Sequence, residues 1–389
     1  FIADRLKRIK PSMTVGINIK ANALRAEGKD VLVLAAGEPD FDTPLNIRNA
    51  ASEAMDSGQT RYVPGKGTPA LQKAIQSKFL NDNNLQYDLD EIIVGVGGKH
   101  IIYNAMMATI NPNDEVIIPA PFWVSYPDIV LLAEGKPVIV QCPESQNFKI
   151  TADQLEKNIT DKTKWLMLNS PSNPTGWVMT KHQQKELLEI CRARNITIIA
   201  DEVYHRMIYD ANVAPSFLEV SRPNDSVIVI NSFSKTYAMT GWRIGWMITP
   251  ESLEEQMATI SECFNTSAPS FIQSAAITAL ETGEETIKSL KKRYHTGREI
   301  VMQVLGNHPL IELSSPQGAF YAFPRIKGLR SSLEFTESLL EKENVGVAPG
   351  YTFGPTNDDY FRLCFAQSQE RLKKALERIV RHVENYSQI

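Results

Sequence analysis

Short apolar runs alternate with helix-like segments through the middle of this chain, and this alternation most limits its fold. Strand-like runs lie at residues 92–94, 115–119, 137–141, 165–168, 196–200 and 226–230. Apolar runs without polar positions are typical of strands buried on both faces of a parallel sheet. The clearest helix between them spans residues 181–194, where Thr180 and Gln183 form a capping box. The sequence therefore predicts an α/β chain with a large, doubly wound, mostly parallel sheet.

The character of the chain changes after about residue 310. Strand candidates at 320–323, 345–347 and 360–365 are separated by helices at 332–342 and 370–386, which is typical of a smaller α+β unit. Further helices are expected at 251–260, 271–280 and 284–305, and an N-terminal arm or helix within residues 1–30. We predict a large domain at 40–285 and a small domain made of 1–39 and 286–389.

Composition narrows the function classes. The net charge of −4 and the pI of about 6.0 give no basic footprint for nucleic acid. No apolar stretch approaches the roughly 18 residues of a membrane span. The four cysteines are far apart, so neither a metal site nor a disulfide framework is indicated, and we expect a reducing, cytoplasmic location. The chain begins at Phe1, which leaves open a removed targeting segment.

Polar side chains follow three neighbouring strand candidates, where an open α/β sheet places its ligand crevice. Asn173 follows the first, Asp201 and Tyr204 the second, and Ser232, Ser234 and Lys235 the third. Alone, such a lysine is a surface residue and such an aspartate a helix cap. In a dry crevice, however, desolvation disfavours the charged form of a lysine. The neutral amine that remains is the form that a Schiff-base lysine requires.

A glycine-rich turn, Gly95-Val96-Gly97-Gly98-Lys99-His100, follows the strand candidate at residues 92–94 and begins a helix. His100 stands where a dinucleotide fingerprint has its third glycine, so the turn suits a single phosphate on exposed N–H groups instead. Pyridoxal phosphate uses all of these groups, because it needs a lysine, a carboxylate at its ring nitrogen, donors at its ring oxygen and a phosphate site. The remaining candidates are Asn173 and Tyr204 for the ring oxygen, Trp123 for stacking, and Ser232, Ser234, Arg243, Gly98, Lys99 and His100 for the phosphate.

Four longer motifs carry a resemblance to a known family. They are Ala36-Gly37-Glu38-Pro39-Asp40-Phe41-Asp42-Thr43-Pro44, Pro121-Phe122-Trp123-Val124-Ser125-Tyr126, Ser170-Pro171-Ser172-Asn173-Pro174-Thr175-Gly176 and Ser234-Lys235-Thr236-Tyr237-Ala238-Met239-Thr240-Gly241-Trp242-Arg243. With them, the chain resembles the class I, fold-type I pyridoxal-phosphate aminotransferases over essentially its whole length. It is most similar to the bacterial aspartate/prephenate aminotransferase subgroup.

The resemblance implies that Lys235 is the Schiff-base lysine and that Asp201 is the partner of the pyridinium nitrogen. It implies substrate contacts from Gly37, Trp123, Asn173 and Arg362. Arg362 could grip a carboxylate with two parallel hydrogen bonds, which a lysine cannot do. The resemblance also implies a homodimer in which Tyr62 reaches the neighbouring subunit's phosphate.

The resemblance to the family leaves the substrate undecided. The resembling subgroup carries a lysine at the position of Lys99 for dicarboxylates, so we expect aspartate as the amino donor and 2-oxoglutarate as the acceptor. His100, Phe122 and His205 depart from the subgroup's usual residues, as does the segment from Cys364 to Ser368. Aromatic, alanine-type or prephenate substrates are therefore alternatives. A carbon–sulfur β-lyase of the same fold is another, and a sensor module would need a DNA-binding segment that is not visible.

Overall fold

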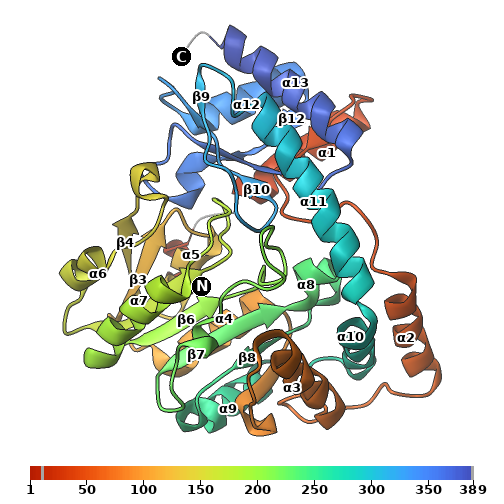
Figure 1. Cartoon of the computed structure of the whole chain (residues 1–389), viewed down its shortest axis with the longest axis vertical. Helices are drawn as coiled ribbons and strands as arrows, with labels where there is room; N and C mark the ends of the chain where they lie inside the picture. The colour runs from red at the N-terminus through yellow and green to blue at the C-terminus, as the bar shows by residue number, and fades with distance from the viewer. Residues whose placement is uncertain (10–12, 387–389) are drawn as a thin grey trace.

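A seven-stranded sheet lies at the centre of the computed structural model, which describes residues 1–9 and 13–386 (Figure 1). Its strands are β2 (Ile92–Gly95), β3 (Glu115–Ala120), β4 (Lys136–Gln141), β5 (Thr163–Asn169), β6 (Thr197–Asp201), β7 (Val227–Ser232) and β8 (Gly245–Ile248). The spatial order is β2-β8-β7-β6-β5-β3-β4. Strand β8 runs antiparallel to β2 and β7, and the other pairs are parallel. The predicted α/β fold with a mostly parallel sheet is confirmed.

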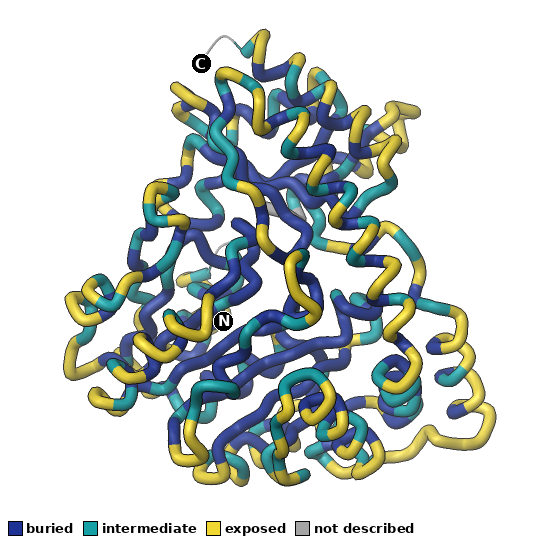
Figure 2. Tube along the Cα trace, in the orientation of Figure 1, coloured by how far each residue is buried: buried dark blue, intermediate teal, exposed yellow. Residues whose placement is uncertain are grey.

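Alternate residues of each central strand enter two hydrophobic cores, one on each face of the sheet. On β6, Ile198 and Ala200 belong to one core and Ile199 to the other. On β7, Val229 belongs to the first of these cores and Ile230 to the second. Since side chains alternate across a strand, both faces must be apolar, which explains the unbroken apolar runs in the sequence. Figure 2 shows the central strands buried along most of their length beneath helices with exposed outer sides.

The helices cover these two faces and extend to the C-terminal part. They are α1 (Met13–Ala26), α2 (Leu45–Asp56), α3 (Pro69–Asn83), α4 (Gly98–Thr109), α5 (Ser125–Leu132), α6 (Ala152–Asn158), α7 (Lys181–Ala193), α8 (Phe233–Thr236), α9 (Glu254–Asn265), α10 (Ser270–Thr282), α11 (Glu284–Val304), α12 (Ser332–Glu343) and α13 (Gln369–Asn385). The predicted capping box of α7 is confirmed: Thr180 Oγ1 accepts from the Gln183 N–H at 3.3 Å, and Gln183 Oε1 accepts from the Thr180 N–H at 3.0 Å. None of the described helices is long and apolar enough to cross a lipid bilayer.

The carboxyl ends of β5, β6 and β7 meet at one edge of the sheet, as predicted. Asn169 pairs in register with Asp201, and Asp201 with Ile230. After β7 the chain turns through α8, which carries Lys235, and returns as β8. The sequence analysis missed β8, because this strand begins with a glycine and its apolar run is too short to stand out.

Smaller sheets make up the C-terminal part, on the same side as this edge (Figure 1). In one of them β14 (Phe361–Cys364) lies between β10 (Tyr321–Ala322) and β13 (Ala348–Pro349). The others pair β1 (Leu32–Val33) with β12 (Val345–Gly346), and β9 (Ile311–Glu312) with β11 (Arg325–Ile326). The division into domains at 40–285 and at 1–39 with 286–389 stays a prediction. Residues 10–12 and 387–389, which fall in the predicted small domain, lie outside the described residues.

Candidate active site

A cavity of about 330 Å³ lies between the carboxyl edge of the central sheet and the small sheet that contains β14. That volume is in the range of small-molecule sites. Its walls include most of the residues predicted from the sequence: Gly37, Gly98, Lys99, Trp123, Asn173, Asp201, Tyr204, Ser232, Ser234, Lys235, Arg243 and Arg362. The fold therefore brings together side chains that are up to 325 positions apart, from Gly37 to Arg362.

Lys235 is presented by the single turn of α8 that follows β7. Ser232 caps this turn by accepting the Ser234 N–H at 3.1 Å, so a buried strand leads directly into the lysine. The Lys235 ammonium donates a hydrogen bond to the carbonyl oxygen of Gly37. Burial lowers the pKa of Lys235 to about 8. The neutral amine, which is the nucleophilic and basic form, is therefore accessible near neutral pH.

Asp201 is the last residue of β6, and its carboxylate is buried with a defined set of donors. Its Oδ2 accepts from the Tyr126 hydroxyl at 2.6 Å, and its Oδ1 accepts from the Val203 N–H at 3.3 Å. Burial raises the pKa of Asp201 to about 6, while these hydrogen bonds and the Lys235 charge oppose the rise. Near pH 7 the group is therefore mostly ionised and can pair with a cationic N–H in the cavity.

Arg362 points from β14 into the same cavity, and it is a buried cation with neutral partners. Its Nη1 donates to Asn173 Oδ1 at 2.8 Å and its Nη2 donates to the Ala35 carbonyl oxygen. Its Nε is buried with no hydrogen-bond partner among the described residues. No described carboxylate forms an ion pair with it, and a buried charge without a counter-ion is costly. The arrangement suits an anion that enters from the cavity.

Hydrogen-bond donors gather at one end of the cavity. Gly97 precedes α4 with a φ of 84°, and a Cβ there would lie 2.3 Å from Nη2 of Arg243. Glycine at this position thus lets the guanidinium reach the first turn of α4, where the leading N–H groups have no side-chain cap. The hydroxyls of Ser232 and Ser234 lie in the same wall, 2.9 Å apart. Together these donors fit a phosphate dianion.

Lys99 and Trp123 form another part of the wall. The Lys99 ammonium lies 4.9 Å from the centre of the Trp123 ring, within the range of a cation–π contact. Partial desolvation lowers the pKa of Lys99, and the nearby charge of Arg243 lowers it further. Lys99 is therefore a further cationic side chain in the cavity wall, in addition to Arg362 and Arg243.

Two predicted site residues lie away from this cavity wall. The His100 side chain is on α4 but packs edge-on against the Phe264 ring, with 6.3 Å between ring centres. Burial and the Arg243 charge lower the pKa of His100, so its imidazole is neutral near pH 7. Tyr62 is 88% exposed and sits in the extended connection between α2 and α3. Within one copy of the chain, neither side chain reaches the cavity.

Three residues of the site were missed by the sequence analysis. Tyr126 donates to Asp201, Asn169 accepts the Asn173 N–H at 2.8 Å, and the Tyr321 hydroxyl lies 2.7 Å from the hydroxyl of Tyr204. Tyr126 is the last residue of one quoted motif, and Asn169 directly precedes another. Their positions could therefore have indicated that they belong to the site. Tyr321 stood in an ordinary apolar run, and its sequence neighbours gave no signal of a polar role.

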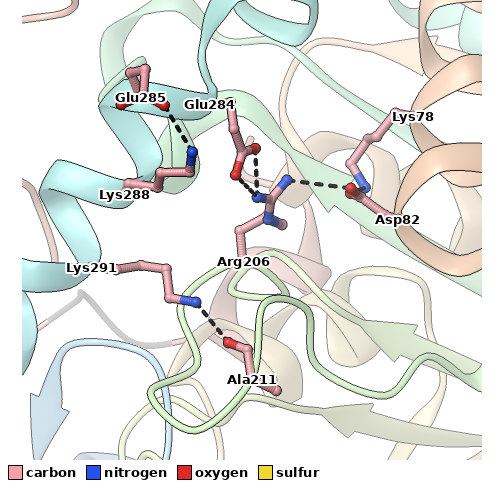
Figure 3. Close-up of polar contacts among 8 residues, drawn as sticks. All are labelled: Lys78, Asp82, Arg206, Ala211, Glu284, Glu285, Lys288 and Lys291. Atoms are coloured by element: carbon pink, nitrogen blue, oxygen red, sulfur yellow. Dashed lines mark hydrogen bonds and ion pairs between the residues drawn. The ribbon is translucent and has the colours of Figure 1, made fainter.

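The segment after β6 has a second face, turned away from the cavity. There Arg206 donates to both oxygens of Glu284 at 2.9 and 2.7 Å and to Asp82 at 3.3 Å, while Lys78 donates to Asp82 at 2.9 Å (Figure 3). We call these four side chains the ion network. Since Asp82 is on α3 and Glu284 begins α11, the network ties two helices to the segment that carries Asp201 and Tyr204.

Buried ionisable groups also adjoin this network. Glu202 accepts the Phe217 N–H at 2.9 Å, and burial raises the pKa of Glu202 to about 8. Burial lowers the pKa of Lys78, although Asp82 opposes the shift. Near pH 7 Glu202 is therefore largely protonated, which avoids an unpaired buried charge.

Comparison with known proteins gives consistent matches over the whole fold. The sequence model for the family described as aminotransferase class I and II matches residues 29–379. An aspartate aminotransferase from Bacillus sp. (strain YM-2) is 40% identical over 390 residues, which cover 98% of this chain and 99% of the relative. A probable aspartate/prephenate aminotransferase from Rhizobium leguminosarum bv. phaseoli is 42% identical over 394 residues, 98% of each chain. The crystal structure of the aspartate aminotransferase from Rhizobium meliloti superposes with a TM-score of 0.93, at 38% identity and over 99% of both chains.

Proposed function

This chain belongs to the class I and II aminotransferase family and is a pyridoxal-phosphate-dependent transaminase, and from that premise we propose that it moves an amino group from L-aspartate to 2-oxoglutarate. The family, the fold type and the cofactor expected from the sequence are thereby confirmed. One arrangement carries the substrate proposal: a buried amine and a buried carboxylate, Lys235 and Asp201, share a cavity with two cationic side chains, Arg362 and Lys99.

When bound, pyridoxal phosphate supplies an electron-withdrawing ring that takes up the electron pair left when the substrate α-carbon loses its proton. Lys235 is the proposed covalent anchor for the cofactor and the base that removes and returns that proton. Its lowered pKa makes the free amine available for this work, and such a positioned group contributes roughly 10²–10⁴-fold. Asp201 is the proposed partner of the ring nitrogen, since its carboxylate is mostly ionised near pH 7.

The remaining cofactor contacts are proposed from the cavity walls. Tyr204 and the Asn173 amide serve the ring oxygen, and Trp123 stacks on the ring. The phosphate is assigned to the donors at the far end of the cavity: Ser232, Ser234, Arg243 and the N–H groups of Gly98, Lys99 and His100. For His100 only the backbone N–H is involved, because its side chain packs on Phe264.

Two cations are proposed to select a dicarboxylate. Arg362 binds the α-carboxylate beside Asn173 and Gly37, since a buried guanidinium without a counter-ion gains most from an incoming anion. Lys99 binds the distal carboxylate from its place beside Trp123 in the wall. Prephenate is a second candidate substrate, because one relative carries that name and the same pair of cations could receive an acidic acceptor.

A spectroscopic titration of the holoenzyme tests the substrate proposal. Aspartate and glutamate are expected to bleach the cofactor absorbance at lower concentration than phenylalanine or alanine, with 2-oxoglutarate and then prephenate restoring it. In Lys99→Met the preference for aspartate should fall a few-fold, since a partly exposed charge pair contributes about 0.2–1 kcal/mol, while phenylalanine should be unaffected. An unchanged aspartate response in this variant would remove Lys99 as the selector. Release of ammonia and pyruvate without a keto acid would identify a lyase instead.

We further propose a homodimer in which Tyr62 reaches the phosphate of the neighbouring subunit. The support is that Tyr62 is exposed, as are two large apolar side chains of the preceding helix α2, Leu45 and Met55. Sedimentation should give twice the chain mass, and Tyr62→Phe should weaken cofactor retention without changing that mass. A monomeric holoenzyme with normal activity would contradict the proposal.

A cytoplasmic location and a two-domain organisation complete the proposal. All four cysteines are free and three of them are buried, which agrees with a reducing compartment. The proposed domains are 40–285 and 1–39 with 286–389, and the boundary at residue 285 falls at the start of the long helix α11 (Figure 1). Limited proteolysis of the apo-protein should cut first between these units.

A further inference from the structure

Tyr321 lies in the wall of the cavity, where its hydroxyl is paired with that of Tyr204. The two oxygens are 2.7 Å apart, and the rings meet edge to face with centres 5.6 Å apart. Tyr204 follows β6 of the central sheet, whereas Tyr321 belongs to β10 of the small sheet. Both side chains are almost fully buried, Tyr204 at 3% and Tyr321 at 1% exposure. The pair is thus a direct polar link between the two sides of the cavity.

Two further contacts fix the position of the Tyr321 ring. The Arg362 guanidinium lies over it, 4.6 Å from the ring centre. At the hydroxyl end of the ring, a Cβ at Gly37 would overlap the Tyr321 hydroxyl oxygen, so only glycine leaves room for that hydroxyl. The ring therefore lies under the arginine, and its hydroxyl end lies against the Gly37 backbone.

The number of hydroxyl hydrogens determines which tyrosine donates to the other when the cofactor is bound. Each phenol has one hydrogen, so only one of the two can donate to the other. If Tyr204 gives its hydrogen to the cofactor, as in the proposed function on which this inference rests, Tyr321 must be the donor within the pair. A donated hydrogen bond polarises the acceptor hydroxyl and makes it a stronger donor in turn.

We propose that Tyr321 is a positioning residue, which donates to Tyr204 and thereby directs the Tyr204 hydrogen to the ring oxygen of the cofactor. Tyr321 touches the reacting groups only through Tyr204, and its ring supports Arg362 independently of its hydroxyl. The two functions of the side chain are therefore separable. Tyr321→Phe removes the hydroxyl and keeps the ring beneath the guanidinium.

The test is the pH at which the absorption of the holoenzyme chromophore changes. A donor at the ring oxygen withdraws electron density and lowers the proton affinity of the chromophore. Tyr204→Phe should therefore raise the midpoint, and Tyr321→Phe should raise it by about 0.3–1 pH unit, the size expected for one weakened hydrogen bond. In the double variant the midpoint should equal that of Tyr204→Phe, because Tyr321 acts through Tyr204.

Tyr209→Phe is the matched control. The Tyr209 hydroxyl donates to the Ala319 carbonyl oxygen at 2.6 Å, two residues from Tyr321, and it does not line the cavity. Removing the Tyr209 hydroxyl removes one hydrogen bond, as Tyr321→Phe does. It should nevertheless leave the midpoint of the chromophore absorption change at its parent value. The affinity of a non-reactive dicarboxylate should also be unchanged in Tyr321→Phe, since the ring beneath Arg362 is kept.

The outcomes separate this inference from the proposed function. The inference would be overturned if Tyr321→Phe shifted the midpoint equally in the parent and in Tyr204→Phe. It would also be overturned if Tyr321→Phe shifted the midpoint in neither. In both cases a coloured holoenzyme would still support the cofactor assignment. A shift of the same size in Tyr209→Phe would also overturn it, because the effect would then be a general result of losing a buried hydroxyl. A protein that stays colourless with the cofactor would overturn the proposed function and this inference together.

Discussion

Arg362 and Arg206 are both buried, with 4% and 7% exposure, and the Nε of each has no hydrogen-bond partner among the described residues, yet their counter-ions differ. Arg206, in the ion network, is neutralised by Asp82 and by both oxygens of Glu284 (Figure 3). Arg362, in the cavity, donates to the neutral oxygens of Asn173 and Ala35. A buried charge with carboxylate partners contributes to structure, whereas one without a counter-ion is available to a ligand. The partners of a buried cation, more than its burial, thus distinguish the two regions.

The same contrast separates two buried lysines. Burial lowers the pKa of both Lys235 and Lys78, but Lys78 has a carboxylate, Asp82, at 2.9 Å. Lys235 contacts the Gly37 carbonyl oxygen instead. A lowered pKa is therefore present in a catalytic candidate and in a structural residue alike, and the contacts decide between them.

The largest expected effect tests this lysine pair. Lys235→Ala should lower turnover by roughly 10²–10⁴-fold or more, because the acid–base group and the covalent anchor are lost together. The apo-protein should be no less stable, since a buried amine without a carboxylate is removed. Steady-state kinetics and urea unfolding check both statements. The matched variant Lys78→Met should keep turnover within a few-fold, and a transaminase that needs Lys78 but tolerates Lys235→Ala would break the comparison.

The next effect concerns the cavity arginine. Arg362→Lys should lower kcat/KM by roughly 10- to 150-fold, which corresponds to about 1.5–3 kcal/mol for a hydrogen bond to a charged group. The loss should appear mainly in KM, because a lysine keeps the charge but cannot grip a carboxylate bidentately. Initial rates over a range of aspartate concentrations measure it. A normal KM in this variant would mean that the carboxylate binds elsewhere.

A smaller effect, on stability, is expected in the ion network. Arg206→Met should lower the free energy of unfolding by about 1–2 kcal/mol. The loss is limited because Lys78 still neutralises Asp82 and because Glu284 is 55% exposed. Chemical unfolding and kinetics should show lower stability with kcat within two- to threefold of the parent. In Arg206→Met/Glu284→Gln part of the stability should return, and a large drop in kcat instead would place Arg206 among the catalytic groups.

The smallest effect is a pH dependence. Capture of pyridoxal phosphate by the apo-protein needs the neutral Lys235 amine, which is present above the pKa of about 8 and is lost below it. The capture rate should therefore rise about fivefold from pH 7 to pH 8 and level off well below the ordinary lysine pKa of about 10.4. Stopped-flow absorbance follows the reaction. A rate that keeps rising tenfold per unit through pH 9 would show that Lys235 is not desolvated.

Much of the cavity could be predicted from sequence because its central-sheet side is local. Asn173, Asp201 and Lys235 each lie within five residues of the end of an apolar run, and the carboxyl ends of parallel strands must meet at one edge. One family motif added Gly37, and the resemblance to the family as a whole added Arg362. Each of these residues is specified by its own few neighbours along the chain.

The pairings between distant segments depended on the tertiary structure. No local pattern indicates that Tyr321 meets Tyr204, that Arg206 meets Glu284, or that the His100 side chain turns toward Phe264. These contacts join residues up to 164 positions apart, from His100 to Phe264, and each is decided by how whole elements pack. The sequence determined which chemistry the chain carries, because strand ends and turn residues are short-range features. Which cations stay free for a ligand was decided only by packing, because a counter-ion can come from any part of the chain.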